Sequence, residues 1–208
     1  VFPGGPKANF RIKAPENLQS KLCGSIRKGH FDGVATVIFH LLRNVKPSFL
    51  ILGEKDWQQF VIIKKLIKDW DLPIKIIGVP TIRDIDELAF SSRNQYLSKS
   101  EREKSLALPH ALTKAAQDAK HGRIVNLKKL RSFLESKDLE VDYLEIVDPH
   151  QLQPIKSNQH FSLLAASVRC GTTRLIDHTF LMNRKPIVAI DGPAGVGKST
   201  VSKSFAER

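Results

Sequence analysis

The fold class is indicated most clearly by one stretch, Phe49-Leu50-Ile51-Leu52-Gly53-Glu54-Lys55-Asp56-Trp57-Gln58-Gln59. Its four apolar residues followed by Gly53 predict a buried strand that ends there. Asp56 occupies an N-cap position, because apolar residues recur at helical spacing from Trp57 to Trp70. Lys55, Asp56 and Gln59 therefore lie at the carboxyl end of a predicted parallel strand, where open α/β sheets bind ligands and a helix N-terminus attracts phosphate. Taken alone, the stretch favours a simpler interpretation, a turn with an aspartate cap and surface amides.

The segments on either side complete a βαβ unit. Ile74 to Val79 is a second apolar run, followed by Pro80, and it predicts a strand parallel to the first. Upstream, apolar residues at helical spacing predict a helix over residues 33–45. We therefore expect the latter part of a Rossmann-like, parallel-sheet α/β domain over residues 1–81, with Pro80–Asp84 as its exit.

Phe90-Ser91-Ser92-Arg93-Asn94 is a second polar cluster. Two hydroxyls and a guanidinium in one loop can hold a polyphosphate, because the arginine fork matches phosphate oxygens. An ordinary polar turn is the alternative, and alone the pattern is weak evidence.

Residues 82–183 alternate short helical and strand patterns. Ser98–Glu101 forms a capping-box pattern that starts a helix, which Pro109 should break or kink. Further helices are predicted at 111–119, stopping at Gly122, and at 127–134. Strands are predicted at 141–147, 161–168 and 173–176, which indicates a small α+β domain with an antiparallel sheet.

Near its end the chain carries Gly192-Pro193-Ala194-Gly195-Val196-Gly197-Lys198-Ser199-Thr200. This stretch fits the P-loop pattern, because a β-branched run at 187–191 predicts a strand before it and a helix is predicted after it. In such a loop backbone N–H groups wrap a phosphate, Lys198 neutralises its charge and Ser199 offers its hydroxyl to Mg²⁺. Asn183–Pro186 resembles a linker, so residues 184–208 are predicted to hold the first strand, P-loop and helix of a P-loop kinase domain.

Three segments resemble pantothenate synthetase, the pantoate–β-alanine ligase family. In family order and spacing they are Gly29-His30-Phe31-Asp32-Gly33-Val34, the stretch from Gly53 to Gln59, and Phe90–Asn94. Phe2-Pro3-x-Gly5 resembles the family's Tyr-Pro-x-Gly segment, and the likeness covers roughly residues 1–180. The sequence of the predicted P-loop is similar to that of cytidylate kinase, so the whole chain resembles a bifunctional pantoate ligase/cytidylate kinase.

The resemblance implies two ATP-dependent reactions. Pantoate would be activated as pantoyl adenylate with release of diphosphate, and the amine of β-alanine would then displace AMP to give pantothenate. The kinase part would transfer phosphate from ATP to CMP or dCMP, with Mg²⁺ as the metal. The resemblance also implies a homodimer that binds these small molecules rather than nucleic acid or a membrane.

Single residues acquire roles from the same resemblance. Lys55, His30 and Arg93 would be catalytic, with Arg27 near the phosphates. Pantoate would be bound by Gln59 and by a helix face whose alternative role is core packing, formed by Val37, Ile38 and Leu41. ATP would be bound by Gly53 and Asp56 at the ribose, by Ile82 and Phe90 around the adenine, and by Glu54, Lys55, Ser91, Ser92 and Arg93.

The chain departs from the family at two positions. The family usually has methionine at Phe90, and phenylalanine can still cover an adenine face. It usually has glycine at Glu87, where a charged residue replaces a conformationally permissive one. Asp142-Tyr143 and Arg174–Asp177 match the family and are interpreted as structural, whereas surface or capping roles are predicted for His150, His160 and His178.

The composition limits the class of protein. The 208 residues are 41% hydrophobic, which is ordinary for a globular protein, and carry a formal net charge of +12. This charge favours anionic partners, but the basic residues are scattered and lack the aromatic interleaving that base stacking uses. Cys23 and Cys170 fit no metal or redox spacing, so we expect reduced thiols and a cytoplasmic protein.

Two alternatives stay open, a P-loop NTPase with a regulatory upstream part and a basic nucleic-acid-binding module. The chain begins at Val1 rather than methionine and ends in a predicted helix, so we expect a fragment of a longer protein. The family's His-x-Gly-His motif would precede Val1, and we therefore expect little or no activity from these residues alone.

Overall fold

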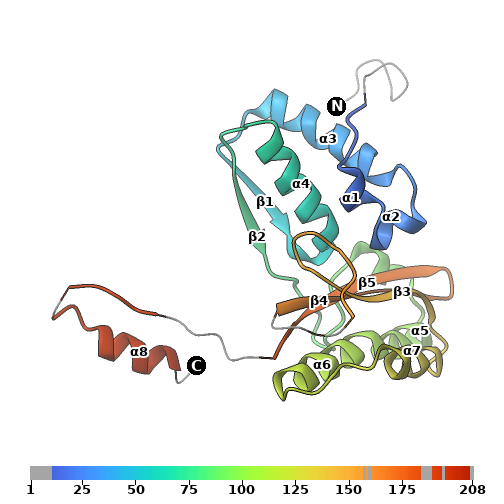
Figure 1. Cartoon of the computed structure of the whole chain (residues 1–208). Helices are drawn as coiled ribbons and strands as arrows, with labels where there is room; N and C mark the ends of the chain where they lie inside the picture. The colour runs from blue at the N-terminus through green and yellow to red at the C-terminus, as the bar shows by residue number, and fades with distance from the viewer. Residues whose placement is uncertain (1–10, 157, 159–160, 184–188, 194, 207–208) are drawn as a thin grey trace.

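The computed structural model describes residues 11–156, 158, 161–183, 189–193 and 195–206. Its strands form a two-stranded and a three-stranded sheet, which lie one above the other in Figure 1. We call the part from α1 to β2 the N-terminal unit and the part from η2 to β5 the C-terminal unit. The N-terminal unit consists of α1 (Glu16–Gln19), α2 (Leu22–Ile26), α3 (His30–Val45), β1 (Phe49–Gly53), the 3₁₀ helix η1 (Glu54–Asp56), α4 (Trp57–Asp69) and β2 (Lys75–Val79).

β1 and β2 pair in parallel through the α4 crossover, which confirms the βαβ prediction. On the inner face, side chains of both strands pack against α3 and α4 in a cluster around Leu42, Ile63 and Ile67. Because side chains alternate across a strand, every second apolar residue points to the outer face. These outer side chains are 37–64% exposed and belong to Phe49, Ile51, Ile77 and Val79.

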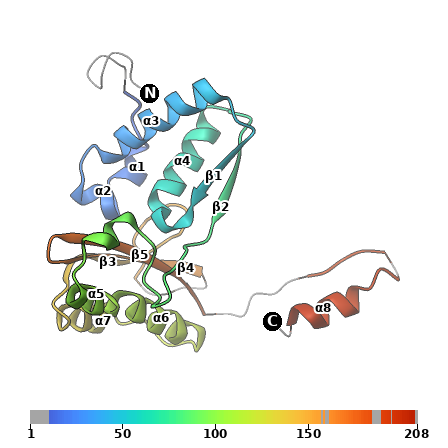
Figure 2. The same ribbon diagram turned by 180° about the vertical axis from the view of Figure 1, so that it is seen from behind.

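The C-terminal unit is a three-stranded antiparallel sheet backed by helices, as predicted. Figures 1 and 2 show α5, α6 and α7 beneath the sheet and the N-terminal unit above it. Its elements are the 3₁₀ helix η2 (Ser92–Tyr96), α5 (Lys99–Ser105), α6 (Ala107–Lys120), α7 (Leu127–Glu135), β3 (Glu140–Val147), β4 (Phe161–Cys170) and β5 (Thr173–Met182).

The middle strand β4 is buried on both faces. Leu164, Ala166 and Val168 pack against the helices, whereas Leu163 and Ala165 pack against the N-terminal unit. Burial of each leucine side chain contributes about 2 kcal/mol, so both faces stabilise the arrangement. The two units therefore share one sheet as a common wall.

Helix boundaries follow local chemistry in the C-terminal unit. The capping box forms between Ser98 and Glu101, as predicted. The break near Pro109 comes slightly earlier than expected, because α6 already begins at Ala107. Proline lies there in the first turn, where its missing N–H has no partner to lose.

The C-terminal end differs from the prediction. α8 (Lys198–Ala206) forms as expected after the P-loop, and it lies apart from the other elements in Figures 1 and 2. The strand predicted at 187–191 is wrong for Ala189–Asp191, which are not extended into a ladder; residues 187 and 188 lie outside the described residues, as does most of the predicted linker. A strand needs a hydrogen-bonded neighbour, and none of the described strands pairs with this segment.

Glu87 has a left-handed backbone, with φ of 69°. Its carbonyl accepts a hydrogen bond from Arg83 Nη1 at 3.0 Å, and its N–H donates to the Asp84 carbonyl at 2.9 Å. These contacts hold the loop in a conformation that costs a non-glycine residue about 1–2 kcal/mol. Glutamate in place of the family's usual glycine therefore costs folding stability, but the loop still forms its turn.

We expect Glu87→Gly to raise the free energy of unfolding by about 0.5–1 kcal/mol, since relief of the left-handed strain exceeds the entropy cost of glycine. Thermal unfolding should shift upward by about 1–4 °C. Glu87→Ala is the matched control, because it removes the exposed side chain and keeps the strain. An equal gain in both variants would contradict the conformational explanation.

Candidate active site

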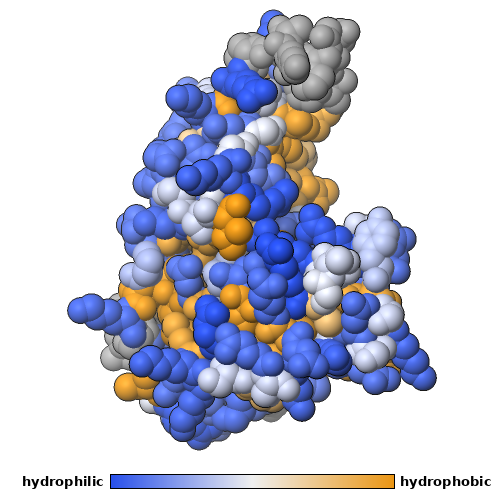
Figure 3. Space-filling view, turned by 90° about the vertical axis from the view of Figure 1, so that its right-hand side faces the viewer, coloured by the Kyte–Doolittle hydropathy of each residue, from blue (hydrophilic) through white to orange (hydrophobic). Residues whose placement is uncertain are grey.

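A pocket of about 620 Å³ lies where the two units meet. Its walls come from α2, the start of α3, η1 with the first turn of α4, η2, and the sheet of the C-terminal unit. Figure 3 views the molecule from the side on which α2 lies in Figure 1, and hydrophilic side chains cover most of that face.

Most polar residues that the sequence singled out line this one pocket. They come from three separate segments, and β1 ends where η1 begins, at the carboxyl edge of its sheet as predicted. The residues brought together are Arg27, His30, Lys55, Asp56, Gln59, Ser91, Ser92 and Arg93.

Other predicted site residues lie outside the pocket wall. The Glu54 carboxylate packs over Gly78, where an added Cβ would lie 2.3 Å from its Oε1. Ile38 packs against the cluster between α3, α4 and the parallel strands. The remaining residues absent from the wall are Gly53, Val37, Leu41, Ile82 and Phe90. The pantoate role of Val37, Ile38 and Leu41 stays a prediction.

Two residues differ from the local roles predicted for them: Asp56 makes no capping hydrogen bond, and His178 is not at the surface. Asp56 is at the N-cap position of α4, but its side chain makes no capping hydrogen bond and instead lines the pocket. His150 is exposed, and His160 lies outside the described residues. The surface prediction for His178 is wrong, because its side chain is only 8% exposed.

His30 is held in its neutral form. Arg27 Nη1 lies 2.9 Å from His30 Nε2, and because a guanidinium can only donate, Nε2 accepts. Burial and the nearby Arg27 charge lower the pKa of His30. With His30 neutral, the positive charge of the pocket comes from arginines and Lys55.

The serine–arginine loop is fixed through its backbone. Ser91 Oγ accepts from the Arg93 N–H at 3.3 Å, and the buried Asn94 side chain donates to the Ala89 carbonyl at 3.1 Å. The Arg93 side chain is left exposed at the pocket. The backbone that carries the Arg93 guanidinium is therefore held in place by these two hydrogen bonds.

The adjacent residues Gln58 and Gln59 make different contacts. Gln58 is 6% exposed, and its amide donates to the carbonyls of Leu18 at 2.9 Å and Lys21 at 2.7 Å. Gln58 thus connects α4 to α1 and to the residue just before α2. Gln59 is half-buried in the pocket wall, one turn after Lys55, where its amide is available to a ligand.

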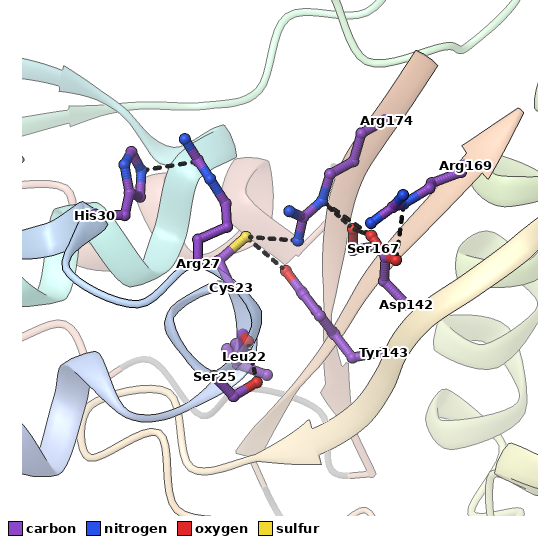
Figure 4. A network of polar contacts seen from close by, with 10 residues as sticks. All are labelled: Leu22, Cys23, Ser25, Arg27, His30, Asp142, Tyr143, Ser167, Arg169 and Arg174. Atoms are coloured by element: carbon purple, nitrogen blue, oxygen red, sulfur yellow. Dashed lines mark hydrogen bonds and ion pairs between the residues drawn. The ribbon is translucent and has the colours of Figure 1, made fainter. Parts of the chain in front are cut away.

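The sequence analysis missed a network on the C-terminal side of the pocket (Figure 4). Arg174 Nε contacts Asp142 at 3.0 Å and Ser167 Oγ at 2.8 Å, and its Nη2 lies 3.6 Å from Cys23 Sγ. Tyr143 OH lies 3.4 Å from the same sulfur. The structural role predicted for Asp142-Tyr143 and Arg174 stays a prediction, and Tyr143 and Arg174 also line the pocket.

His178 joins the same wall beneath η1. Its ring packs against Trp57 at 5.8 Å and Phe180 at 5.6 Å between centroids. Burial lowers the pKa of His178, while the neighbouring Asp177 charge and the Lys55 backbone act in the opposite direction. His178 therefore supports η1, which carries Lys55, from the β5 side.

The segment predicted to be a P-loop lies outside this pocket. Lys198 Nζ donates to the carbonyls of Gly192 and Pro193, each at 2.7 Å. Gly195 and Gly197 have φ of 84° and 79°, values that favour glycine. Ala194 lies outside the described residues. The lysine thus folds back over the loop at the start of α8, where a P-loop binds phosphate.

The comparisons with known proteins agree on one family. A family model described as pantoate-beta-alanine ligase matches residues 2–180. A relative from Prochlorococcus marinus (strain MIT 9303), named bifunctional pantoate ligase/cytidylate kinase, is 57% identical over 100% of this chain and 43% of its own length. The chain therefore spans less than half of that relative.

Solved structures support the same assignment. Pantothenate synthetase from Thermus thermophilus is 33% identical with a TM-score of 0.79, over 87% of this chain and 66% of that one. A pantoate-beta-alanine ligase from Francisella tularensis, complexed with beta-gamma ATP and beta-alanine, is 31% identical with a TM-score of 0.69, over 86% of this chain and 60% of that one. Because the family model covers most of the chain, this protein belongs to the pantoate–β-alanine ligase family.

Proposed function

We propose that the full-length protein condenses pantoate with β-alanine in an ATP-dependent reaction. The pantoate carboxylate attacks the α-phosphorus of ATP, and diphosphate leaves as pantoyl adenylate forms. The amine of β-alanine then attacks the pantoyl carbonyl, loses a proton and displaces AMP, giving pantothenate.

The observation that carries this proposal is the convergence of cations on one pocket. Arg27, Lys55 and Arg93 come from three separate segments and line it together with Ser91 and Ser92. None of these three cations forms a salt bridge among the described residues. Fixed positive groups in a concave, partly desolvated site stabilise the charge that develops on transferring phosphates.

Each group has a part in the first step. Lys55 stabilises charge on the α-phosphate, and Arg93 with Ser91 and Ser92 holds the triphosphate. Neutral His30 offers its Nδ1–H to a phosphate oxygen, since Nε2 is occupied by Arg27. Asp56, near the end of β1, is available to the ribose hydroxyls with the Gly53 backbone.

Ile82 and Phe90 are suited to the adenine ring. The Phe90 N–H donates to the Ile82 carbonyl at 2.9 Å, which brings the two residues side by side. Their side chains are 68% and 62% exposed, an unusual degree for large apolar groups in adjacent positions. Two such side chains can cover the faces of a base, which explains why phenylalanine can replace methionine here.

The test is pantoate-dependent exchange of labelled diphosphate into ATP by the full-length protein. Exchange that requires pantoate and no β-alanine, followed by AMP release when β-alanine is added, is expected. ATP hydrolysis without dependence on pantoate would contradict the proposed ligase reaction.

For Gln59→Ala we expect a rise in the Michaelis constant for pantoate of about tenfold, the worth of one hydrogen bond of 1–1.5 kcal/mol. The constant for ATP should change little, because an amide has no charge to offer a triphosphate. Steady-state kinetics with each substrate varied separately provide the measurement.

Gln58→Ala is the matched control for that experiment. It removes two hydrogen bonds to backbone carbonyls, one within α1 and one just before α2, so it should lower the melting temperature. Equal effects of Gln59→Ala on both Michaelis constants, or a loss of stability like that of Gln58→Ala, would assign Gln59 a structural role.

The P-loop supports a second activity, phosphate transfer from ATP to CMP or dCMP in the full-length protein. The relatives' names include cytidylate kinase, and Gly192–Thr200 fits the phosphate-binding pattern. Ser199 would hold Mg²⁺ together with ATP phosphates, which suits a metal that is bound by few protein ligands. The described residues contain no cluster of three His, Cys, Asp or Glu that could form a separate metal site.

Partners of the full-length protein are therefore small molecules: ATP, pantoate, β-alanine and CMP or dCMP. A homodimer stays a prediction from the family resemblance. Among the described residues, no helix is long and apolar enough to cross a membrane.

A further inference from the structure

The network in Figure 4 contains an excess of positive charge. Asp142 is 6% exposed and contacts both Arg169 at 3.0 Å and Arg174 at 3.0 Å. One carboxylate therefore faces two guanidinium groups. Arg169 is 43% exposed and is screened by water, whereas the Arg174 side chain is only 17% exposed. The uncompensated charge thus resides in a partly desolvated place, where an anion is strongly favoured.

The geometry of Arg174 directs this charge into the pocket. Its Nε is engaged by Asp142 and Ser167, which fixes the plane of the guanidinium on β5. Of the remaining N–H groups, those of Nη1 make no hydrogen bond to another described residue, and Nη2 meets only the weak acceptor Cys23 Sγ. Arg174 lines the pocket, so a fixed fork of free donors faces a ligand there.

Arg174 lines the pocket from a different wall than the proposed phosphate-binding groups. Lys55 and Arg93 come from η1 and η2, whereas Arg174 projects from the sheet of the C-terminal unit. Lys55 and Arg174 also line a small adjoining cavity, so the two walls are close together. The Arg174 charge is one of those that lower the pKa of His30, after burial and Arg27.

We propose that Arg174 binds the carboxylate of β-alanine and so orients its amine toward the acyl adenylate. This inference rests on the proposed function. A planar guanidinium matches a carboxylate in bidentate fashion, and it leaves the other end of a short amino acid free. The amine is then directed toward the neighbouring wall with Lys55, where the activated carbonyl is held.

The experiment separates the two half-reactions in the full-length protein. Arg174→Ala should leave pantoate-dependent diphosphate exchange within about threefold of wild type, because adenylate formation does not involve β-alanine. It should reduce kcat/KM for β-alanine by about 10- to 100-fold, the range for a charge-assisted contact. Retained exchange also serves as the folding control.

Selectivity provides the readout that a merely structural role would not move. Wild type should prefer β-alanine to β-alaninamide, which has an amine but no carboxylate. This preference should fall in Arg174→Ala by the same factor as kcat/KM, and Arg174→Lys should restore part of it. Arg169→Ala removes the other cation on Asp142 outside the pocket wall and leaves the Arg174 guanidinium in place, so it should reduce this preference far less than Arg174→Ala does.

The outcomes are distinct. An unchanged preference for β-alanine, or equal losses of exchange and of the complete reaction in Arg174→Ala, would overturn the assignment of Arg174. Absence of pantoate-dependent exchange in wild type would instead contradict the proposed function itself.

Discussion

Replacing Lys55 with alanine in the full-length protein is expected to slow pantoyl-adenylate formation by about two to three orders of magnitude, the effect of losing roughly 2–4 kcal/mol of transition-state stabilisation. Lys55 lies on η1 at the end of β1, in the pocket wall, and forms no salt bridge among the described residues. Its ammonium is therefore free for a phosphate oxygen. Because charge on the phosphate increases in the transition state, the loss should appear mainly in kcat.

Pantoate-dependent diphosphate exchange measures this step directly. Lys64→Ala is the matched control, since Lys64 is exposed on α4 and does not line the pocket. Lys55→Arg should retain part of the activity, because it keeps the charge and changes only its geometry. If exchange by Lys55→Ala stays within a few-fold of wild type, Lys55 does not contact the reacting phosphate.

Lys198→Ala is expected to reduce phosphate transfer to CMP by at least about two to three orders of magnitude, because the P-loop loses its phosphate-neutralising side chain. Pantothenate formation should persist at the wild-type rate. No described residue of the P-loop or α8 lines the pocket between the two units. The two nucleotide sites should therefore be separable.

Both reactions are assayed on one preparation of the variant. Lys203→Ala, on the same helix α8, controls for general effects of removing a lysine there. Collapse of both activities in a soluble, folded Lys198→Ala protein would mean a single shared site. Such a result would eliminate the two-enzyme interpretation.

Local signals in the sequence predicted much of the fold. The β1–α4–β2 unit and the three antiparallel strands follow from patterns that repeat every two or 3.6 residues, and the start of α5 follows from its capping box. Such patterns act over a few neighbouring residues, so no distant contact is needed to recognise them. The strand predicted at 187–191 was wrong for Ala189–Asp191, because a strand also requires a hydrogen-bonded partner and no local pattern supplies one.

Motifs likewise predicted residues that lie together in the pocket. Arg27, His30, Lys55 and Arg93 belong to recognisable sequence motifs, and they line one pocket. Gln58 and Gln59 could not be separated by chemistry, because they are the same residue type at adjacent positions. Their difference depends on which side of α4 meets the loop around Leu18 and Lys21.

By itself the sequence determined the elements, their order and one wall of the pocket, because these depend on local periodicity and on recognisable motifs. Tertiary structure alone decided the other wall, which includes Arg174. Arg174 and Cys23 are 151 residues apart, and they meet only because β4 is buried on both faces and joins the two units. The burial of His178 and the single carboxylate shared by Arg169 and Arg174 arise from the same packing, which no pattern of neighbouring residues encodes.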